Sequence, residues 1–231
     1  MCYNLLGDYM NLREELFNNR DLKYRDFHKK LVPNVDESKI IGVRVPIVRK
    51  IAKSAFQNNA ENLCEYYEEK EVFGLTISMK KRSAEEHKKD ISEFVSLIDN
   101  WAICDICTAS LKFIAKNKAQ YFDFLSSFVG AGEYPTRFAI VALMDFYLDD
   151  EYIDRVLDLY KTILSEKYYV NMALAWAYST AFVKYEEKVI GLIKSKTLSP
   201  WVQNKTIQKI RESYRVCLLY TSPSPRDYAA S

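Results

Sequence analysis

The sequence predicts an all-α protein in which pairs of helices stack into a curved solenoid, and two observations lead to this expectation. Apolar residues recur at helical spacing along almost the whole chain, as in residues 134–148, and no stretch alternates as a strand does. The chain has 17 Tyr and 12 Phe but only 6 Gly and 6 Pro. This balance favours long packed helices over a loop-rich sandwich.

Helix starts recur along the chain at a nearly constant interval. Alternate expected helices begin roughly 30 to 35 residues apart, about the unit length of tetratricopeptide or HEAT arrays. In such an array each helical pair packs against its neighbours, and the second helices line a concave face where function is expected. An irregular helical bundle is the alternative, because residue identities do not recur. The expected starts lie near Pro46, Glu71, Trp101, Pro135, Tyr168 and Pro200.

Helix-breaking residues fall at the joints between the expected helices. Ser199 can cap a helix whose first position is Pro200, and the other breakers mark short connections between antiparallel helices. We therefore expect one continuous repeat domain over residues 1–216. The joints contain Pro33 and Asn34, Gly42 to Pro46, Gly130 to Pro135, and Ser199 with Pro200.

Residues 217–231 differ in character from the rest of the chain. The run CLLYTSPSPRD, from Cys217 to Asp227, has no helical period and is followed by YAAS. This run matches the translation of a transposase adapter of the kind used in sequencing libraries. We therefore interpret residues 217–231 as a non-native tail and leave them out of the functional reasoning. A disordered Ser/Pro tail is the alternative interpretation.

The overall charge argues against a protein that binds nucleic acid through net charge alone. The formal net charge is only +2, so any nucleic-acid contact requires positive side chains to gather on one face. No signal peptide or apolar run of membrane length is visible, and five cysteines without a secreted-scaffold spacing suit a reducing compartment. We expect a cytoplasmic monomer without membrane association.

One cysteine pair has the spacing of a metal or redox motif. Cys104 and Cys107 form a C-x-x-C, but the chain offers no second pair and only two histidines, His28 and His87. A zinc site would require four ligands, so we interpret the two cysteines as small packing residues. Accordingly, we expect no metal site and no cofactor.

Trp101 and Asp105 are spaced one helical turn apart. On a helix both side chains project from one face, which places an indole ring beside a carboxylate. This pair suits the cationic sugar that forms when an N-glycosidic bond breaks, because carboxylates and aromatic faces both stabilise positive charge. The alternatives are that Trp101 and Trp176 are core residues and that Asp105 only pairs with Arg137 on the adjacent repeat.

Four segments, in order, are similar to segments of the AlkD family of DNA alkylation repair proteins. The resemblance covers nearly all of residues 8–215 and implies an α–α superhelix of HEAT-like, ARM-type repeats. It also implies a DNA glycosylase that excises cationic N3- or N7-alkylated purines from duplex DNA in base excision repair, holding the lesion from the backbone side. The segments are IIGVRVPIVRKIAK from Ile40 to Lys53, DNWAICD from Asp99 to Asp105, YPTRFAIVALMDFY around Arg137, and NMALAWAY around Trp176.

The resemblance implies a role for each site residue. Asp105 would be the catalytic carboxylate, Trp101 and Trp176 would pack on deoxyriboses, and Arg137 would clamp a phosphate. An alkylated base that is already cationic leaves without protonation, which fits a site without histidine. One departure is Asn100, which stands where the best-studied members have a further tryptophan. The competing interpretation is a non-catalytic HEAT-like module, binding DNA or a protein, in which Asp105 is buried in an ion pair.

Basic residues recur through several of the expected repeats, as they would if the concave face followed a phosphate backbone. Lys205 and Lys209 are four residues apart and share a helix face, so they are the leading candidates at one end of the groove. Any one cluster alone is usually part of a solvated surface. The candidate DNA-binding residues are Arg44, Arg49, Lys80, Lys81, Lys205 and Lys209.

Overall fold

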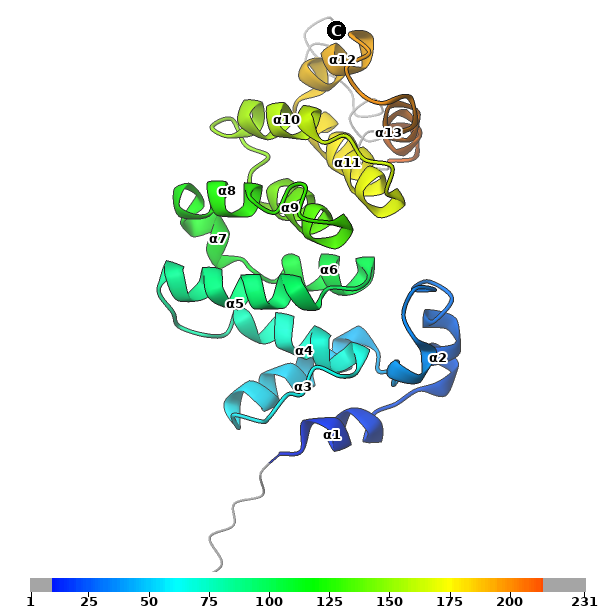
Figure 1. The fold of residues 1–231 in the computed structure, drawn as a ribbon, viewed down its shortest axis with the longest axis vertical. Helices are drawn as coiled ribbons and strands as arrows, with labels where there is room; N and C mark the ends of the chain where they lie inside the picture. The colour runs from blue at the N-terminus through cyan, green and yellow to red at the C-terminus, as the bar shows by residue number, and fades with distance from the viewer. Residues whose placement is uncertain (1–9, 214–231) are drawn as a thin grey trace, which may run out of the picture. The chain divides into compact units, whose positions relative to one another are not determined.

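The computed structural model describes residues 10–213, and in this range helices alternate with turns and short connections, with no strand (Figure 1). The predicted all-α fold class is confirmed. Two compact units divide the chain, residues 1–138 and residues 139–231, and helix α9 (Glu133–Phe146) contains the boundary between them. The expected non-native tail, residues 217–231, lies outside the described residues.

The first unit consists of helices that pack mainly against their neighbours in the chain. Helix α3 packs against α4, α4 packs against both α5 and α6, and α5 also packs against α8. Helix α1 contacts both α3 and α4. The elements are α1 (Leu12–Asn18), α2 (Leu22–His28), the 3-10 helix η1 (Glu37–Lys39), α3 (Val45–Gln57), α4 (Tyr67–Ile77), α5 (Ala84–Leu97), α6 (Trp101–Thr108), α7 (Phe113–Lys116), α8 (Lys118–Ser126) and the beginning of α9.

A buried carboxylate on α4 fixes the segment that leads into α3. Glu68 accepts hydrogen bonds from the backbone N–H groups of Ile41, Gly42 and Val43, with N···O distances of 2.9, 2.6 and 3.1 Å. Gly42 has a φ of +96°, and a Cβ atom there would lie 2.5 Å from the Cβ of Arg25. The glycine is therefore required both by its backbone conformation and by the close approach of α2.

Helix α4 also approaches α5 and α6 closely, at Gly74. A Cβ atom on Gly74 would lie 2.5 Å from the ring of Phe94 and 2.7 Å from the side chain of Cys107, so a larger residue would push these helices apart. Cys104 and Cys107 are both fully buried. The interpretation of the C-x-x-C as a pair of packing residues is confirmed.

The second unit is centred on helix α11, which packs against both α12 and α13. One face of α11 is lined with small and apolar side chains, including the buried residues Ala173, Ala177 and Ala181. Helix α10 joins α9 through the hydroxyl of Tyr160, which donates to the carbonyl oxygen of Ile140 at 2.8 Å. The elements are the end of α9, α10 (Ile153–Thr162), α11 (Tyr168–Phe182), α12 (Glu186–Lys194) and α13 (Pro200–Glu212).

The predicted helix starts agree with the structure at five of the six positions to within two residues. Helices α3, α6, α9, α11 and α13 begin at Val45, Trp101, Glu133, Tyr168 and Pro200. The expectation of a start at Glu71 was wrong, because α4 begins four residues earlier. The Glu69 side chain accepts a hydrogen bond from the Tyr66 N–H at 3.1 Å and so closes the first turn before that point.

Within residues 10–213, no helix is both long enough and apolar enough to span a bilayer.

Candidate functional site

The candidate site in the first unit is built around an ion pair between α6 and the beginning of α9. Arg137 donates from Nε to Oδ1 of Asp105 at 2.9 Å and from Nη2 to Oδ2 at 2.7 Å. The side chain of Arg137 is 6% exposed and that of Asp105 is 16% exposed. This two-pronged geometry fixes the plane of the carboxylate, and Asp105 is the partner that solvent reaches more easily.

Burial and pairing act on the Asp105 carboxyl in opposite directions. Removal from water raises its pKa, whereas the hydrogen bonds and the positive charge of Arg137 lower it, and the net direction is upward from the ordinary aspartate value. Burial lowers the pKa of the Arg137 guanidinium and the pairing with Asp105 raises it, and the net direction is upward, so the guanidinium is protonated throughout the physiological range. The charges of Asp105 and Arg137 largely cancel, and the negatively charged Asp105 is nearer to solvent than Arg137.

Trp101 is the first residue of α6 and lies one turn before Asp105. Its ring is partly exposed, and its Nε1–H donates to the backbone oxygen of Leu31 at 2.8 Å. The connection that follows α2 therefore fixes the indole plane. Trp101 and Asp105 both belong to α6 and are four residues apart, so the indole and the carboxylate project from the same side of this helix.

Asn100, which precedes Trp101, has a structural task of its own. Its side-chain oxygen accepts a hydrogen bond from the backbone N–H of Ile103 at 3.0 Å, and its amide donates to the Asp99 carboxylate at 2.8 Å. The residue is buried and is the N-cap of α6. Asn is among the preferred residues at this position, since its side chain satisfies an N–H group that the helix leaves unpaired.

Further polar residues join the elements around α6, and sequence reasoning did not select them. The side-chain amide of Asn34 donates to the backbone oxygen of Asp99 and to the hydroxyl of Tyr134, the latter at 2.8 Å. The ammonium group of Lys70, on α4, pairs with the Asp99 carboxylate. The contacts of Asn34 span 65 and 100 residues of sequence, so no local pattern could reveal them. The sequence marked this position only as a joint between helices, through the helix-breaking residues Pro33 and Asn34.

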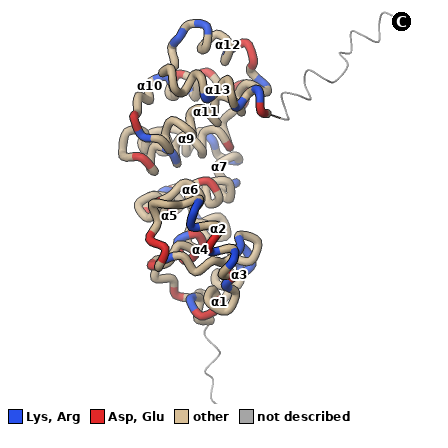
Figure 2. The backbone as a smooth tube through the Cα atoms, turned by 90° about the vertical axis from the view of Figure 1, so that its right-hand side faces the viewer, with Lys and Arg blue, Asp and Glu red and all other residues tan. Residues whose placement is uncertain are grey.

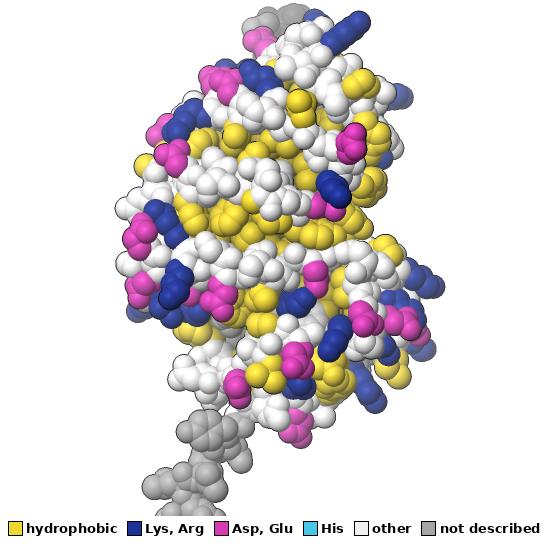
Figure 3. Space-filling view, in the orientation of Figure 1, with side chains coloured by type: hydrophobic (Ala, Val, Ile, Leu, Met, Phe, Trp, Pro, Cys, Tyr) yellow, Lys and Arg dark blue, Asp and Glu magenta, His cyan; other side chains and the backbone are white. Residues whose placement is uncertain are grey.

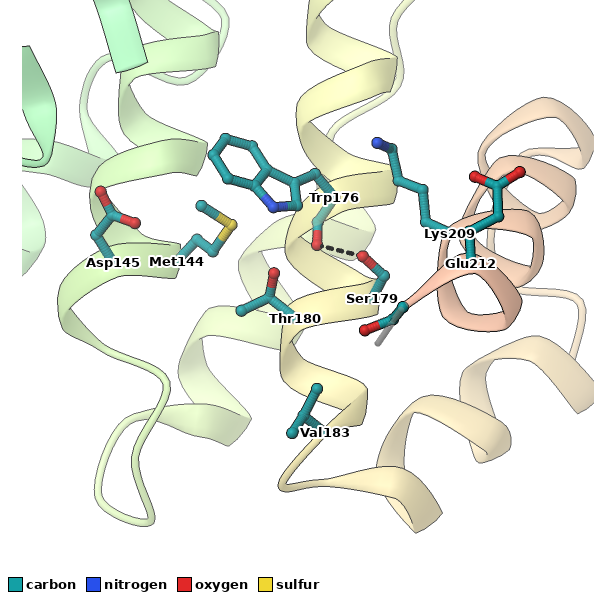
Figure 4. A pocket seen from close by; sticks show the side chains of 9 residues that line it. Met144, Asp145, Trp176, Ser179, Thr180, Val183, Lys209 and Glu212 are labelled. Carbon is teal, nitrogen blue, oxygen red and sulfur yellow. Dashed lines mark hydrogen bonds between the residues drawn. The ribbon is translucent and has the colours of Figure 1, made fainter. Parts of the chain in front are cut away.

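The second unit contains a separate pocket of about 600 Å³ that includes Trp176 (Figure 4). The Trp176 indole is 36% exposed and lies above Met144, while the side chain of Lys209 extends from α13 toward it. Ser179 donates to the backbone oxygen of Trp176 at 2.8 Å. The lining residues are Met144 and Asp145 from α9, Trp176, Ser179, Thr180 and Val183 from α11, and Lys209, Glu212 and Ser213 from α13 and its end.

Comparison with known protein families identifies the family of this protein. The family model described as DNA alkylation repair enzyme matches residues 11–210, almost the whole described chain. The chain belongs to this DNA alkylation repair family. The resemblance to the AlkD family is thereby confirmed, and a role in DNA repair follows from membership. A search of curated proteins gives no match.

The basic candidates of this DNA alkylation repair protein differ in what surrounds them. Arg44 pairs with Asp21 at 2.9 Å and Lys80 with Asp90 at 3.2 Å, so a phosphate would compete with a carboxylate at both. Positive residues of α3 mark that helix in Figure 2, and Figure 3 shows positive and negative side chains interspersed on the face that it draws. Arg49 and Lys81 are exposed, Lys209 borders the Trp176 pocket, and Lys205 donates to Gln208 at 3.0 Å.

Among residues 10–213, no group of three or more His, Cys, Asp and Glu side chains lies close enough together to hold a metal ion. The described residues of the candidate site in the first unit include a carboxylate, a guanidinium group and an indole ring.

Proposed function

We propose that this DNA alkylation repair protein is a glycosylase that excises cationic N3- or N7-alkylated purines from duplex DNA. The observation that carries the proposal is the Asp105 carboxylate, which Arg137 fixes and which lies one turn from the partly exposed Trp101. Membership of a repair family for alkylated DNA supplies the substrate class.

The proposed reaction separates the base from the sugar without a general acid. The bond between C1′ and the purine nitrogen breaks, and the base leaves with the bonding electrons as a neutral molecule, because the alkyl group had made it cationic. Positive charge then develops at C1′ and O4′ of the sugar. Water adds to C1′ and releases a proton to solvent, which leaves an abasic site.

Asp105 would stabilise the sugar cation through its field and orient the attacking water. The negative end of the Asp105–Arg137 pair is the more exposed end, with 16% of the Asp105 side chain accessible against 6% for Arg137. A carboxylate already held in position does not have to reorganise as charge develops, which is the main source of such stabilisation.

The remaining candidates have supporting roles in the proposal. Trp101 would pack against a deoxyribose, because an aromatic face attracts a neighbouring cationic sugar. Packing of Trp176, in the second unit, against a deoxyribose stays a prediction. Arg137 would position Asp105, which its two hydrogen bonds to that carboxylate support, and its contact with a phosphate stays a prediction. Contacts of Arg49, Lys81 and Lys209 with the DNA backbone are also predictions.

The test measures base release from a duplex that carries a single N7-methylguanine. We expect release by the chain and a loss of about 100-fold or more in Asp105→Asn, the range seen when one preorganised stabilising group is removed. Asp158→Asn, which changes an exposed carboxylate on α10, is the matched control and should release the base at the original rate. Circular dichroism establishes that both variants fold.

A second candidate function is favoured by one observation. Both oxygens of Asp105 accept hydrogen bonds from Arg137, as expected if the carboxylate only joins α6 to α9. In that case the protein binds DNA, or another protein, without excising bases. Absence of release in the original chain, together with DNA binding that weakens as salt increases, would assign this second function.

A further inference from the structure

The α11–α13 pair carries exposed aromatic rings beside lysines. Tyr168, Met172 and Trp176 are four residues apart along α11 and therefore share one face. Trp201, Lys205 and Lys209 have the same spacing on α13, which packs against α11. We call these six residues the α11–α13 surface.

Two of its rings meet at the beginnings of the two helices. The centroids of Tyr168 and Trp201 are 5.9 Å apart with an interplanar angle of 72°, and Tyr168 also contacts Tyr169 edge-to-face at 5.3 Å. Tyr168 is 57% exposed and Trp201 is 42% exposed. Neighbouring aromatic rings normally bury most of their area, so this exposure leaves ring faces available to a ligand.

The backbone that holds Trp201 is firmly fixed. Ser199 caps α13 by accepting from the N–H of Val202 at 3.4 Å, and Pro200 is the first residue of the helix. Val202, next to Trp201, is buried, so the first turn of α13 is anchored to the unit. A ligand would therefore meet rings whose positions are already set, which reduces the entropy lost on binding.

The charge beside the rings is suited to a phosphate. Lys205 lies one turn, about 6 Å, after Trp201 and hydrogen-bonds the neutral Gln208 rather than a carboxylate. On α13 the acidic residue is Glu212, which accepts from Gln208 at 2.8 Å; Glu166, just before α11, is exposed, and Asp145 of α9 lines the pocket that Lys209 borders. Glu212 lies almost two turns beyond Lys205 along α13, so no carboxylate of α13 shares a helix turn with the Lys205 ammonium group.

We propose that Tyr168 and Trp201 bind an unpaired nucleobase of a DNA strand by stacking, while Lys205 binds the adjoining phosphate. Base–aromatic stacking combined with lysine contacts to the backbone is how proteins hold single strands with little sequence preference. Within a duplex both faces of a base are covered by its neighbours, so these rings select unpaired nucleotides. The inference rests on DNA as the ligand of the proposed function, but not on base excision.

The test compares the binding of a fluorescein-labelled oligothymidylate with that of a fully paired duplex of equal length, at fixed salt. We expect Trp201→Ala and Tyr168→Ala each to weaken oligothymidylate binding by about 5- to 100-fold, the range that stacking on one base supplies. Duplex binding should change by less than about twofold. Phe27→Ala, which removes an equally exposed ring on α2, should change neither affinity.

A second measurement follows the emission of tryptophan. Trp201→Phe keeps a ring that stacks, so it should retain most of the oligothymidylate affinity while losing the part of the fluorescence quenching that Trp201 supplies. Equal losses on duplex and single strand in Trp201→Ala, or no loss on either, would overturn the proposal. The probes carry no alkylated base, so a failure of the proposed glycosylase activity leaves this measurement unaffected.

Discussion

The indole N–H of Trp101 donates a hydrogen bond to the backbone oxygen of Leu31 across 70 residues of sequence, at 2.8 Å. The same connection after α2 supplies Asn34, whose amide bonds the backbone of Asp99 and the hydroxyl of Tyr134. The orientation of the Trp101 indole therefore depends on the segment after α2. No residue of this segment was selected from the sequence as part of the site.

Asn34→Ala tests this dependence. The substitution removes two hydrogen bonds, each contributing about 1 kcal/mol, and allows the connection to move away from α6 and α9. We expect the rate of base release to fall several-fold because Trp101 loses its fixed orientation, while the melting temperature changes by only a few degrees. Asn34→Leu keeps the approximate size of the side chain but neither donates nor accepts, so it should resemble the alanine variant. An unchanged rate in both variants would contradict the dependence.

Most of the helical order could be predicted from the sequence, but the contacts around the site could not. Helix starts at Trp101, Tyr168 and Pro200 follow from local patterns, since periodicity and caps act within a few residues. The family motif pointed to Asp105 and Arg137. The bidentate hydrogen bonds between Arg137 and Asp105, and the hydrogen bond from Asn34 to Tyr134 on α9, depend on which helices pack together. The spacing of residues along the sequence does not contain this information.

The same limit applies to the start of α4 and to Asn100. Glu71 has the helical spacing of a first-turn residue, but the hydrogen bond from Tyr66 to Glu69 begins the helix earlier. Asn100 could be recognised from sequence only as a position where an aromatic is absent. The structure shows that its side chain caps α6, which is a positive reason for asparagine at this position.

Removal of Arg137 should strongly destabilise the first unit. Arg137→Met leaves the Asp105 carboxylate largely buried without its partner, and loss of one member of such a pair costs about 3 to 5 kcal/mol. Urea unfolding measures the loss. Arg20→Met, at an exposed position between α1 and α2, is the matched control and should cost less than about 0.5 kcal/mol.

The double variant Asp105→Leu with Arg137→Met separates pairing from packing. Removing both charges leaves no unpaired buried ion, so we expect this variant to recover most of the stability that Arg137→Met loses. A double variant less stable than either single variant would mean that the two side chains act through packing rather than through their charges.

Substitutions at Asn100 test whether capping explains the absent aromatic. Asn100→Ala should lower the free energy of unfolding by about 1 kcal/mol, because the N–H of Ile103 loses its partner, whereas Asn100→Ser keeps a capping oxygen. Asn100→Trp should be the least stable of the three, since the position is buried and offers no room for an indole. Thermal unfolding ranks them, and a stable Asn100→Trp variant would contradict this explanation.

The buried carboxyl of Glu71 should make stability depend on pH. Glu71 is 0% exposed on α4, and neither of its oxygens has a hydrogen-bond partner among residues 10–213. Burial raises its pKa to about 8, the Glu68 carboxylate acts in the same direction, and Arg49 opposes them. The neighbouring groups Tyr24, Tyr67 and Cys107 have raised pKa values and stay neutral near pH 7.

The direction in which stability changes with pH follows from the number of protons bound by the folded and the unfolded chain. Between pH 4.5, the ordinary glutamate pKa, and pH 8, the folded chain holds a proton on Glu71 that the unfolded chain has released. The free energy of unfolding therefore falls as pH rises through this window, by up to about 1.4 kcal/mol per pH unit. Stability that Glu71 contributes at pH 5 is largely lost by pH 8.

Glu71→Gln isolates this contribution, because glutamine has nearly the shape of the protonated acid and does not titrate. Urea unfolding at pH 6 and pH 8 should show the original chain losing about 2 kcal/mol more than Glu71→Gln over this interval. Groups that titrate elsewhere in the chain act equally on both proteins and cancel in the difference. Equal pH dependence in the two proteins would mean that Glu71 is ionised in the folded state, and therefore that water or a shift of the exposed Arg49 side chain reaches its carboxylate.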